Sequence, residues 1–348
     1  MSDKAVNHNK NNKSDELFSD INLLIGDELK KVDEIIINNS RNASSLIADI
    51  VKHLILSGGK RIRPILTILS AKLCGYNSNI KTNIRHANLA AAIELIHTAT
   101  LLHDDVIDES GLRRGKKTSN AIWGNKASIL VGDYLLSIAF ELMILDGSLP
   151  ILKLLSNASS IMADGEIKQL NNRNNIEISE REYLEIIFSK TAILFSAALQ
   201  IGAIITDSSK EKSLKNFGTN LGMSFQITDD ILDYSSKEQI LGKEIGNDFF
   251  EGKITLPIII TYKNANQNEK RRLQEIFSAN LANNKKEYNQ KLLQEILALI
   301  NKYKALEEAQ LKAKHYQILA QKTLNSFSKS KEKEMLLAIL NYLITRQY

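Results

Sequence analysis

Residues 90–108 read AAAIELIHTATLLHDDVID, an apolar stretch with helical periodicity that ends in the acidic motif DDVID at 104–108. A matching stretch at 220–233, NLGMSFQITDDILD, ends in the motif DDILD at 229–233. Because positions i and i+4 lie on the same face of an α-helix, the first and last aspartates of each motif project together. Clustered carboxylates repel one another unless cations lie between them, and Mg²⁺ prefers oxygen ligands. Two such faces lining one cavity predict a magnesium site, whereas a solvated acidic face is the plainer alternative for either motif alone.

Periodicity and composition favour an all-α fold. The chain of 348 residues contains only three prolines, and the segments between them carry helical rather than alternating apolar patterns. No linker rich in Pro, Gly or Ser interrupts the polar motifs of 58–253, so we expect one domain over 17–348, preceded by a disordered polar tail at 1–16. The longest apolar run, 191–206, is short for a membrane span and contains Gln200, which predicts a buried core helix and no transmembrane segment.

The balance of charges and cysteines narrows the classes of function. The net charge is +5, from 45 basic and 40 acidic residues, which is too mild to predict a nucleic-acid partner. Cys74 is the only cysteine, so no intrachain disulfide can form and a reducing compartment is expected. The N-terminal segment has neither the apolar core of a secretory signal nor the arginines of a transit peptide, which predicts a cytoplasmic location.

Basic residues accompany the acidic motifs along the sequence. In GGKRIRP at 58–64, Lys60 and Arg63 are three apart near the start of a predicted helix, where both can reach one anion. Arg113 and Arg114 follow the first acidic motif in a glycine-bounded turn, and adjacent guanidinium groups that point apart can bind two different phosphates. Separated cations around two acidic clusters indicate diphosphate chemistry, although each basic segment taken alone could be an ordinary solvated loop.

The order of these motifs resembles that of the trans-isoprenyl diphosphate synthases, and most closely that of their long-chain, octaprenyl-type branch. The resemblance extends from about residue 50 to residue 257 and is carried by GGKRIRP, LLHDDVIDESGLRRGK, KT, FQITDDILD and GKEIGNDFFEGKITLP. It implies an isoprenoid synthase-type bundle of helices around a deep central cavity, usually in a homodimer. It also implies two or three Mg²⁺ ions per active site and two substrates, isopentenyl diphosphate and an allylic diphosphate such as farnesyl diphosphate.

The resemblance also assigns roles to individual residues. The metal ligands would be Asp104 and Asp108, supported by Asp105, and Asp229, assisted by Asp230 and Asp233. The allylic diphosphate would be bound by Arg113, Lys190, Gln226, Lys243 and Lys253. Isopentenyl diphosphate would be bound by Lys60, Arg63, His97 and Arg114. Thr191 would lie near the developing carbocation, whereas His97 has the alternative of being an ordinary core histidine on an apolar helix.

The implied reaction is ionisation, condensation and elimination. Metal ions and cations stabilise the leaving diphosphate, the double bond of isopentenyl diphosphate attacks the allylic cation, and a proton is then lost to the released diphosphate. Short-chain members of the family commonly carry an aromatic residue four or five positions before the first aspartate, where this chain has Thr100 and Ala99. With Ile96 and Ala92, Ala99 forms a one-turn series that predicts a tunnel wall. A long product is therefore expected, and quinone side chains are its usual destination.

Two other classes share part of this pattern. A class I terpene cyclase also uses an aspartate-rich helix and Mg²⁺, but its second motif is typically of an Asn/Ser/Glu type and it needs no second diphosphate site. A non-catalytic subunit of a heteromeric prenyl synthase would be expected to lose aspartates or substrate cations, and none is missing here. Elongation of farnesyl diphosphate with isopentenyl diphosphate and Mg²⁺ separates the three readings.

Overall fold

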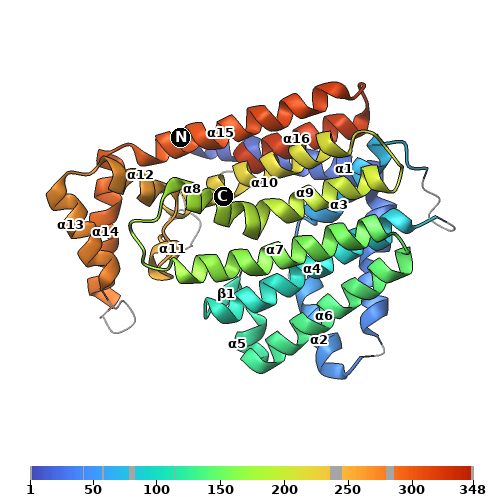
Figure 1. Cartoon of the computed structure of the whole chain (residues 1–348), viewed down its shortest axis with the longest axis horizontal. Coiled ribbons are helices and arrows are strands. Elements are labelled where there is room, and N and C mark those ends of the chain that lie inside the picture. Colours follow the sequence, from blue (N-terminus) through green and yellow to red (C-terminus); the bar gives the residue numbers. More distant parts are fainter. Residues whose placement is uncertain are drawn as a thin grey trace. The chain divides into compact units, whose positions relative to one another are not determined.

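The computed structural model describes residues 2–41, 43–56, 59–77, 83–113, 115–235, 245–279 and 286–345. Helices make up most of the described chain, as Figure 1 shows, so the predicted all-α class is confirmed. The helices are α1 (Ser2–Ser40), α2 (Ser45–Leu56), α3 (Ile62–Leu73), α4 (Arg85–Ile107), α5 (Ser119–Trp123), α6 (Asn125–Asp146), α7 (Leu149–Asn171), α8 (Glu180–Ile187), a π-helix (Phe188–Ala192), α9 (Ile193–Ile204), α10 (Glu211–Asp233), α11 (Asn247–Phe250), α12 (Leu256–Asn264), α13 (Gln267–Ser278), α14 (Lys286–Lys302), α15 (Ala305–Thr323), a 3₁₀ turn (Leu324–Ser326) and α16 (Lys331–Thr345). The two short strands, β1 (Leu112–Arg113) and β2 (Lys116–Lys117), form an antiparallel hairpin.

Local sequence explains several helix boundaries. Ser179 and Glu182 form a capping box at the start of α8, and Asn266 and Glu269 do the same for α13, so unpaired main-chain N–H groups are satisfied at both starts. Pro257 occupies the first turn of α12, where its missing N–H costs no hydrogen bond. Each of these helices therefore begins where its own sequence dictates.

Contacts divide the chain into two compact units. The first unit comprises Met1–Ser159, Leu194–Asn216 and Leu324–Ile339, and the second comprises Ser160–Ile193, Phe217–Thr323 and Leu340–Tyr348. The predicted single domain over 17–348 stays a prediction. So does the predicted tail at 1–16, although α1 includes residues 2–16.

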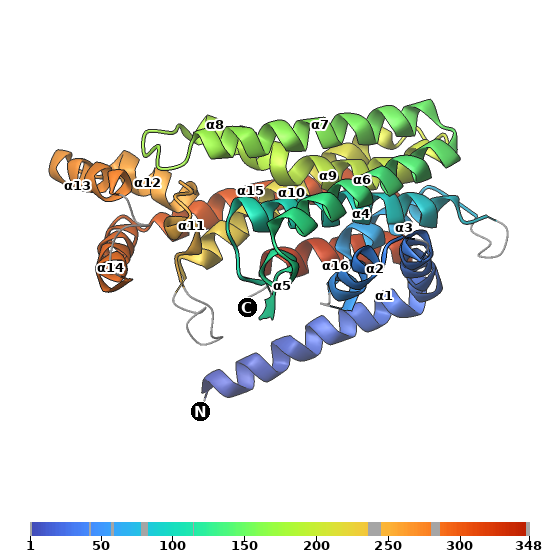
Figure 2. The same cartoon turned by 90° about the horizontal axis from the view of Figure 1, so that it is seen from below.

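The first unit is organised around α4. This helix packs against α6, α3 and α1, and it lies beside α6 in the views of Figures 1 and 2. The fully buried side chains of α1, α3 and α4 include the aliphatic residues Ile25, Leu66, Leu69, Leu89 and Ile93. Burying one such side chain contributes about 1.5–3 kcal/mol, so the apolar half of α4 anchors the acidic motif at its end.

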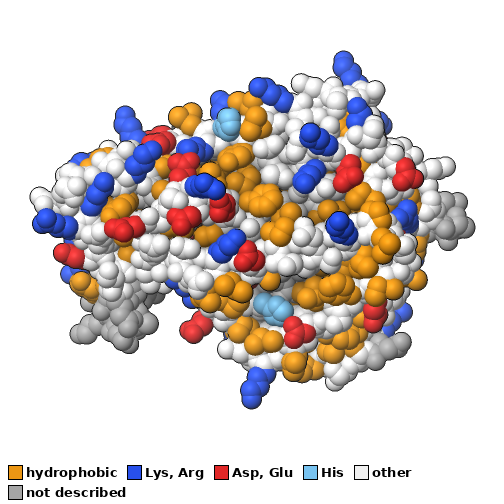
Figure 3. All heavy atoms as spheres, viewed as in Figure 1, with side chains coloured by type: hydrophobic (Ala, Val, Ile, Leu, Met, Phe, Trp, Pro, Cys, Tyr) orange, Lys and Arg blue, Asp and Glu red, His pale blue; other side chains and the backbone are white. Residues whose placement is uncertain are grey.

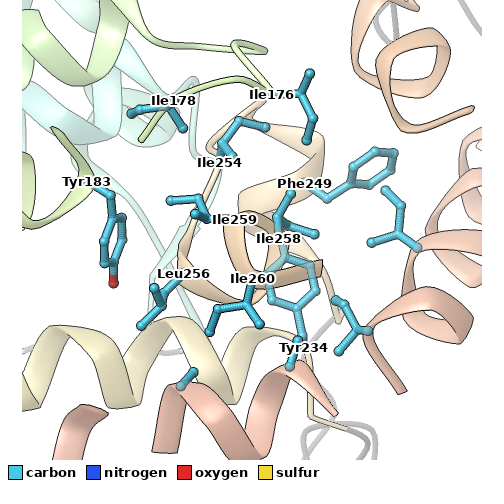
Figure 4. Packing of buried hydrophobic residues seen from close by; sticks show 14 of the residues in the cluster. Ile176, Ile178, Tyr183, Tyr234, Phe249, Ile254, Leu256, Ile258, Ile259 and Ile260 are labelled. Carbon is cyan, nitrogen blue, oxygen red and sulfur yellow. The ribbon is translucent and has the colours of Figure 1, made fainter. Parts of the chain in front are cut away.

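The second unit has its core around α12. Figure 4 shows Ile258, Ile259 and Ile260 of α12 packed within a cluster that also contains Phe249. Phe249 makes an edge contact with Phe277 of α13, with ring centroids 5.7 Å apart. The apolar side chains of the segment that leads into α12 therefore hold this segment in place. The polar residues that lie between these apolar side chains are positioned as a result.

Two helical segments of the described chain are long and apolar enough to cross a membrane by length and composition, Asn125–Asp146 and Glu180–Ile204. The second is almost completely buried within the protein. The prediction that the apolar run at 191–206 forms a buried core helix is therefore confirmed up to Ile204, where the helix ends.

Candidate active site

The first acidic motif lies at the C-terminal end of α4. Asp104 and Asp105 belong to its last turn, and Asp108 follows as the C-cap, with its main-chain N–H bonded to the carbonyl of Asp104 at 2.8 Å. Asp104 and Asp108 are partly exposed, whereas Asp105 is buried. The carbonyl end of a helix is itself partly negative, and α4 has no basic residue in its last turn. The motif is therefore placed where it favours cations.

Asp105 binds the arginine of the hairpin that follows. Both Nε and Nη2 of Arg113 donate to Oδ1 of Asp105, at 2.9 and 2.7 Å. The carbonyl oxygen of Asp105 also accepts from Nδ2 of Asn120 at 3.1 Å. The carboxyl group of Asp105 thus holds the guanidinium of Arg113, and the expected role of Asp105 in supporting the metal ligands stays a prediction. Arg114 lies outside the described residues.

The described part of the GGKRIRP segment, residues 59–64, leads into the start of α3. Arg61 is its N-cap and adopts the left-handed conformation, with φ 48° and ψ 38°. Lys60 is exposed, with its Nζ 5.3 Å from the ring centroid of Phe18, whereas Arg63 is partly buried, with Cζ 4.5 Å from that of Phe195. These cations belong to the first unit, as do Asp104 and Asp108.

The residues expected to govern product length lie on α4. Ala92, Ile96 and Ala99 are all buried, with at most 2% of their surface exposed. Thr100 is partly buried, and its Oγ1 donates to the carbonyl oxygen of His97 at 2.8 Å. The series lies on one buried helix face, and its role as a tunnel wall that sets product length stays a prediction.

In the second unit, Lys190 and Thr191 lie in the π-helix. The wider π turn places an additional residue in the helix and often marks a functional site. Lys190 Nζ donates to Oε2 of Glu166 at 2.7 Å and to Oε1 of Gln169 at 2.9 Å, both on α7. Thr191 Oγ1 donates to Oε1 of Gln226 on α10 at 2.7 Å. The π-helix thus connects predicted site residues with α7 and α10.

Two glycines allow these helices to approach the π-helix closely. A Cβ at Gly165 of α7 would lie 2.7 Å from Cβ of Ser189, and a Cβ at Gly222 of α10 would lie 2.5 Å from Cα of Ala192. Carbon atoms in contact are normally about 3.5–4.0 Å apart, so neither position accepts a larger side chain without movement. The hydrogen bonds of Lys190 and Thr191 depend on this close approach.

Gln226 and Asp230 continue the hydrogen-bond network along α10. Gln226 Nε2 donates to Oδ1 of Asp230 at 2.9 Å, and the hydroxyl group of Tyr183 donates to Oδ2 at 2.6 Å. Burial raises the pKa of Asp230 to about 6, although the bonds from Tyr183 and Gln226 act in the opposite direction. Burial and the neighbouring Asp230 raise the pKa of Tyr183, so its hydroxyl group remains a donor.

Asp233 organises the segment that follows α10. Its Oδ1 accepts from the main-chain N–H of Asn247 at 3.1 Å, and its Oδ2 from that of Asp248 at 3.0 Å. Burial, together with Asp233 and Asp230, raises the pKa of Asp248 well above its usual value. Lys253 lies nearby on the same segment, with its Nζ 2.5 Å from Oε2 of Glu251. Lys243 lies outside the described residues.

A cavity of about 80 Å³ in the second unit brings these groups together. Its polar lining includes Lys190, Thr191, Gln226, Asp230, Asp248 and Lys253. Four of these residues come from three separate sequence segments and are predicted to bind substrate: Lys190, Thr191, Gln226 and Lys253. The sequence did not single out Tyr183 or the α7 pair Glu166 and Gln169, because a lone tyrosine or glutamate on a helix carries no recognisable pattern. Asp248 belongs to the motif GKEIGNDFFEGKITLP, but the family resemblance assigns no role to it.

The carboxylates suit a hard divalent cation, because Mg²⁺ takes oxygen ligands and the acidic motifs supply them. Within the described parts of the chain, no group of three or more His, Cys, Asp or Glu side chains lies close enough to hold a metal ion by itself. The assignment of Asp104, Asp108, Asp229 and Asp233 as metal ligands stays a prediction.

Comparison with known proteins identifies the family. Residues 44–296 match the polyprenyl synthetase family. The octaprenyl diphosphate synthase of Haemophilus influenzae is 36% identical over 333 residues, which are 95% of this chain and 98% of that protein. A decaprenyl diphosphate synthase from Rhodobacter capsulatus has a similar structure, with a TM-score of 0.86 and 37% identity over 94% of this chain and 98% of that chain.

A second solved structure adds information on ligands. The polyprenyl synthase from Caulobacter crescentus, complexed with calcium and isoprenyl diphosphate, has a TM-score of 0.86 and 35% identity, covering 95% of this chain and 98% of that chain. The range that matches the family, residues 44–296, contains the acidic and basic motifs that carry the resemblance. The chain therefore belongs to the polyprenyl synthetase family, and it is a prenyltransferase of the long-chain trans-polyprenyl diphosphate synthase type.

Proposed function

We propose that this chain adds isopentenyl diphosphate units to farnesyl diphosphate, with Mg²⁺, by ionisation, condensation and elimination. The observation that carries the proposal is the cavity of the second unit, whose lining joins Lys190, Gln226 and Lys253 to the buried Asp230. Cations and amide donors beside carboxylates are the groups that bind a diphosphate through bridging metal ions. The family resemblance assigns the other set of carboxylates to the acidic end of α4.

Two or three magnesium ions would be held by Asp104, Asp108 and Asp229, with help from Asp233, and would stabilise the negative charge of the leaving diphosphate. The calcium ion in the polyprenyl synthase from Caulobacter crescentus supports a site for a divalent cation. Calcium and magnesium are both hard cations that take oxygen ligands.

The chain itself binds and aligns the two substrates. Lys190, Gln226 and Lys253 would bind the allylic diphosphate, and the buried Asp105 orients Arg113 for the same task. Lys60, Arg63 and His97, with Arg114, would bind isopentenyl diphosphate. Thr191, fixed by Gln226, would lie near the cationic carbon atom. Alignment of two substrates in a site that excludes water lowers the barrier without a protein nucleophile.

The product is proposed to be long and to serve as a quinone side chain. Ala99 and Thr100 leave no bulky side chain one turn before the first acidic motif, and Ala99 belongs to a buried face of α4. The octaprenyl and decaprenyl diphosphate synthases among the relatives support a long product.

We further propose that the enzyme is a cytoplasmic homodimer. Figure 3 shows hydrophobic side chains gathered over the region of α6. Leu130, Ile144 and Leu145 of this helix expose 68%, 67% and 74% of their surface, and Leu149 beyond it exposes 76%. Exposed aliphatic side chains of this kind along one helix favour a protein interface. Light scattering should give about twice the chain mass of 39.0 kDa, and a mass near that of one chain would contradict the dimer.

The function is tested with purified protein, farnesyl diphosphate, labelled isopentenyl diphosphate and Mg²⁺. We expect extractable polyprenyl products, whose length mass spectrometry measures, and no product after addition of a chelator. The matched variant is Asp104→Asn, which removes one negative charge from the acidic end of α4 and should abolish elongation. A protein that converts farnesyl diphosphate alone into hydrocarbon would be a terpene cyclase, and one that elongates nothing would contradict the proposal.

A further inference from the structure

Arg61 adopts a conformation that arginine rarely takes. Its φ of 48° and ψ of 38° lie in the left-handed region, which is strained for a residue with a side chain. Among the described residues, four others that are not glycine have a positive φ, Glu109, Asn174, Asp207 and Lys304. Arg61 differs from them because it stands between two residues expected to bind substrate, Lys60 and Arg63. Strain of this kind persists only where surrounding contacts hold it.

Two carboxylates hold the Arg61 side chain. Its Nη1 lies 2.7 Å from Oε1 of Glu94 on α4, and its Nε lies 3.4 Å from Oδ1 of Asp33 on α1. Glu94 is 6% exposed, and the Arg61 side chain is 19% exposed, so the pair is largely shielded from water. Burial and the neighbouring Glu94 raise the pKa of Asp33, although Arg61 acts in the opposite direction.

The backbone of Arg61 also starts α3. The carbonyl oxygen of Arg61 accepts from the N–H of Ile65 at 3.0 Å, which is the first turn of the helix. Arg63 lies within this turn, and Lys60 precedes the left-handed residue directly. Glu94 lies one helical turn before His97 on α4. The ion pair therefore ties the segment that carries Lys60 and Arg63 to the helix that carries His97.

We propose that Arg61, Glu94 and Asp33 are positioning residues, which fix Lys60 and Arg63 in the geometry that binds isopentenyl diphosphate. The inference rests on the proposed function and adds residues that do not themselves touch substrate. A buried ion pair is weak evidence of stabilisation, because its desolvation cost offsets much of the attraction. The strained backbone and the position between two diphosphate ligands favour a role in positioning instead.

The chain supplies a matched control in the pair formed by Lys72 and Glu28. Nζ of Lys72 lies 2.7 Å from Oε1 of Glu28, and their side chains are 22% and 10% exposed. This pair also joins α3 to a neighbouring helix, but at the opposite end of α3, roughly 16 Å along the axis from Arg61. Glu28→Gln should therefore destabilise the protein as Glu94→Gln does, without reaching Lys60 or Arg63.

The test measures both Michaelis constants and the urea unfolding of the two variants. We expect Glu94→Gln to raise the KM for isopentenyl diphosphate roughly tenfold, because small displacements of aligned groups are costly, and to leave the KM for farnesyl diphosphate within about twofold. Glu28→Gln should leave both constants within about twofold of those of the parent enzyme. Equal effects of the two variants on the KM for isopentenyl diphosphate, or no effect of Glu94→Gln, would overturn the inference.

A double-variant cycle provides the second measurement. Arg61→Gly accepts the left-handed backbone without strain but lacks the guanidinium, so it should raise the same KM. Arg61→Gly combined with Glu94→Gln should raise it no further than the larger single effect, because both changes remove one interaction. Fully multiplied effects would overturn the coupling. A parent protein that elongates nothing would instead refute the proposed function, and the two failures are thus distinguishable.

Discussion

Gly222→Ala tests whether close packing of α10 against the π-helix sets the active site. The added Cβ would lie 2.5 Å from Cα of Ala192 and 2.9 Å from its Cβ. Normal carbon contacts are about 3.5–4.0 Å, so the two helices must separate by about 1 Å. The bond from Thr191 to Gln226, now 2.7 Å, would lengthen to about 3.7 Å and cease to be a hydrogen bond.

The magnitude follows from two opposing effects. Overpacking of a core contact costs about 1–3 kcal/mol, whereas replacing a helical glycine by alanine gains up to about 1 kcal/mol. A net loss of about 1–2 kcal/mol in the free energy of unfolding is expected from urea denaturation. The kcat/KM for farnesyl diphosphate should fall at least tenfold, because a displacement of about 1 Å at aligned groups can cost up to a hundredfold.

Gly202→Ala is the matched control. A Cβ at Gly202 of α9 would lie 2.4 Å from the main-chain N of Ala71 on α3, so the overpacking is at least as severe. Both residues belong to the first unit and neither is a predicted substrate contact. This variant should lose stability while keeping kcat/KM for farnesyl diphosphate within about threefold, because distant sites are largely independent. If Gly222→Ala unfolds at lower urea but elongates as fast as the parent, the packing argument is refuted.

Three further predictions concern other groups. Tyr183→Phe removes a hydrogen bond to the buried carboxylate of Asp230, and urea denaturation should show a loss of about 1.5–3 kcal/mol in the free energy of unfolding. A loss below about 0.5 kcal/mol would contradict a stabilising role of this hydrogen bond. Burial lowers the pKa of His86 from 6.5 to about 4. As the pH falls, the unfolded chain therefore takes up a proton on His86 before the folded chain does. The free energy of unfolding should consequently fall by about 3 kcal/mol when the pH is lowered from 6.5 to 4. His86→Phe should flatten this part of the pH profile, and an unchanged slope would refute the assignment. Ala99→Phe should shorten the product in chromatography and mass spectrometry, whereas an unaltered length would remove Ala99 from the tunnel wall.

The sequence predicted the helical class and the location of the first acidic motif well, because both follow from local pattern. Apolar periodicity continues through 90–103 and stops at the aspartates, where α4 also ends. Lys190, Thr191 and Gln226 were predicted from the family pattern, and the structure brings them to one cavity. Their roles toward substrate remain predictions.

Other features could not be read from sequence because they depend on tertiary packing. The π-helix at 188–192 has no signature in FSKTA, and it arises where α7 and α10 approach at two glycines. Glu166, which accepts a hydrogen bond from Lys190, lies on a different helix, and no local spacing in the sequence reveals this pairing. The left-handed conformation of Arg61 has no local sequence signature, and the carboxylates that hold its side chain lie on α1 and α4.

The bond between Asp105 and Arg113 changes the electrostatics of the first acidic motif. The motif contains three carboxylates, and the buried one is matched by a guanidinium fixed eight residues later. Three negative charges and one positive charge leave a formal charge of −2, which a single divalent cation would neutralise. Asp105 and Arg113 therefore neutralise each other within the motif: without Arg113 the motif would carry a third uncompensated negative charge, and without Asp105 the guanidinium would lose the buried carboxylate that fixes its position.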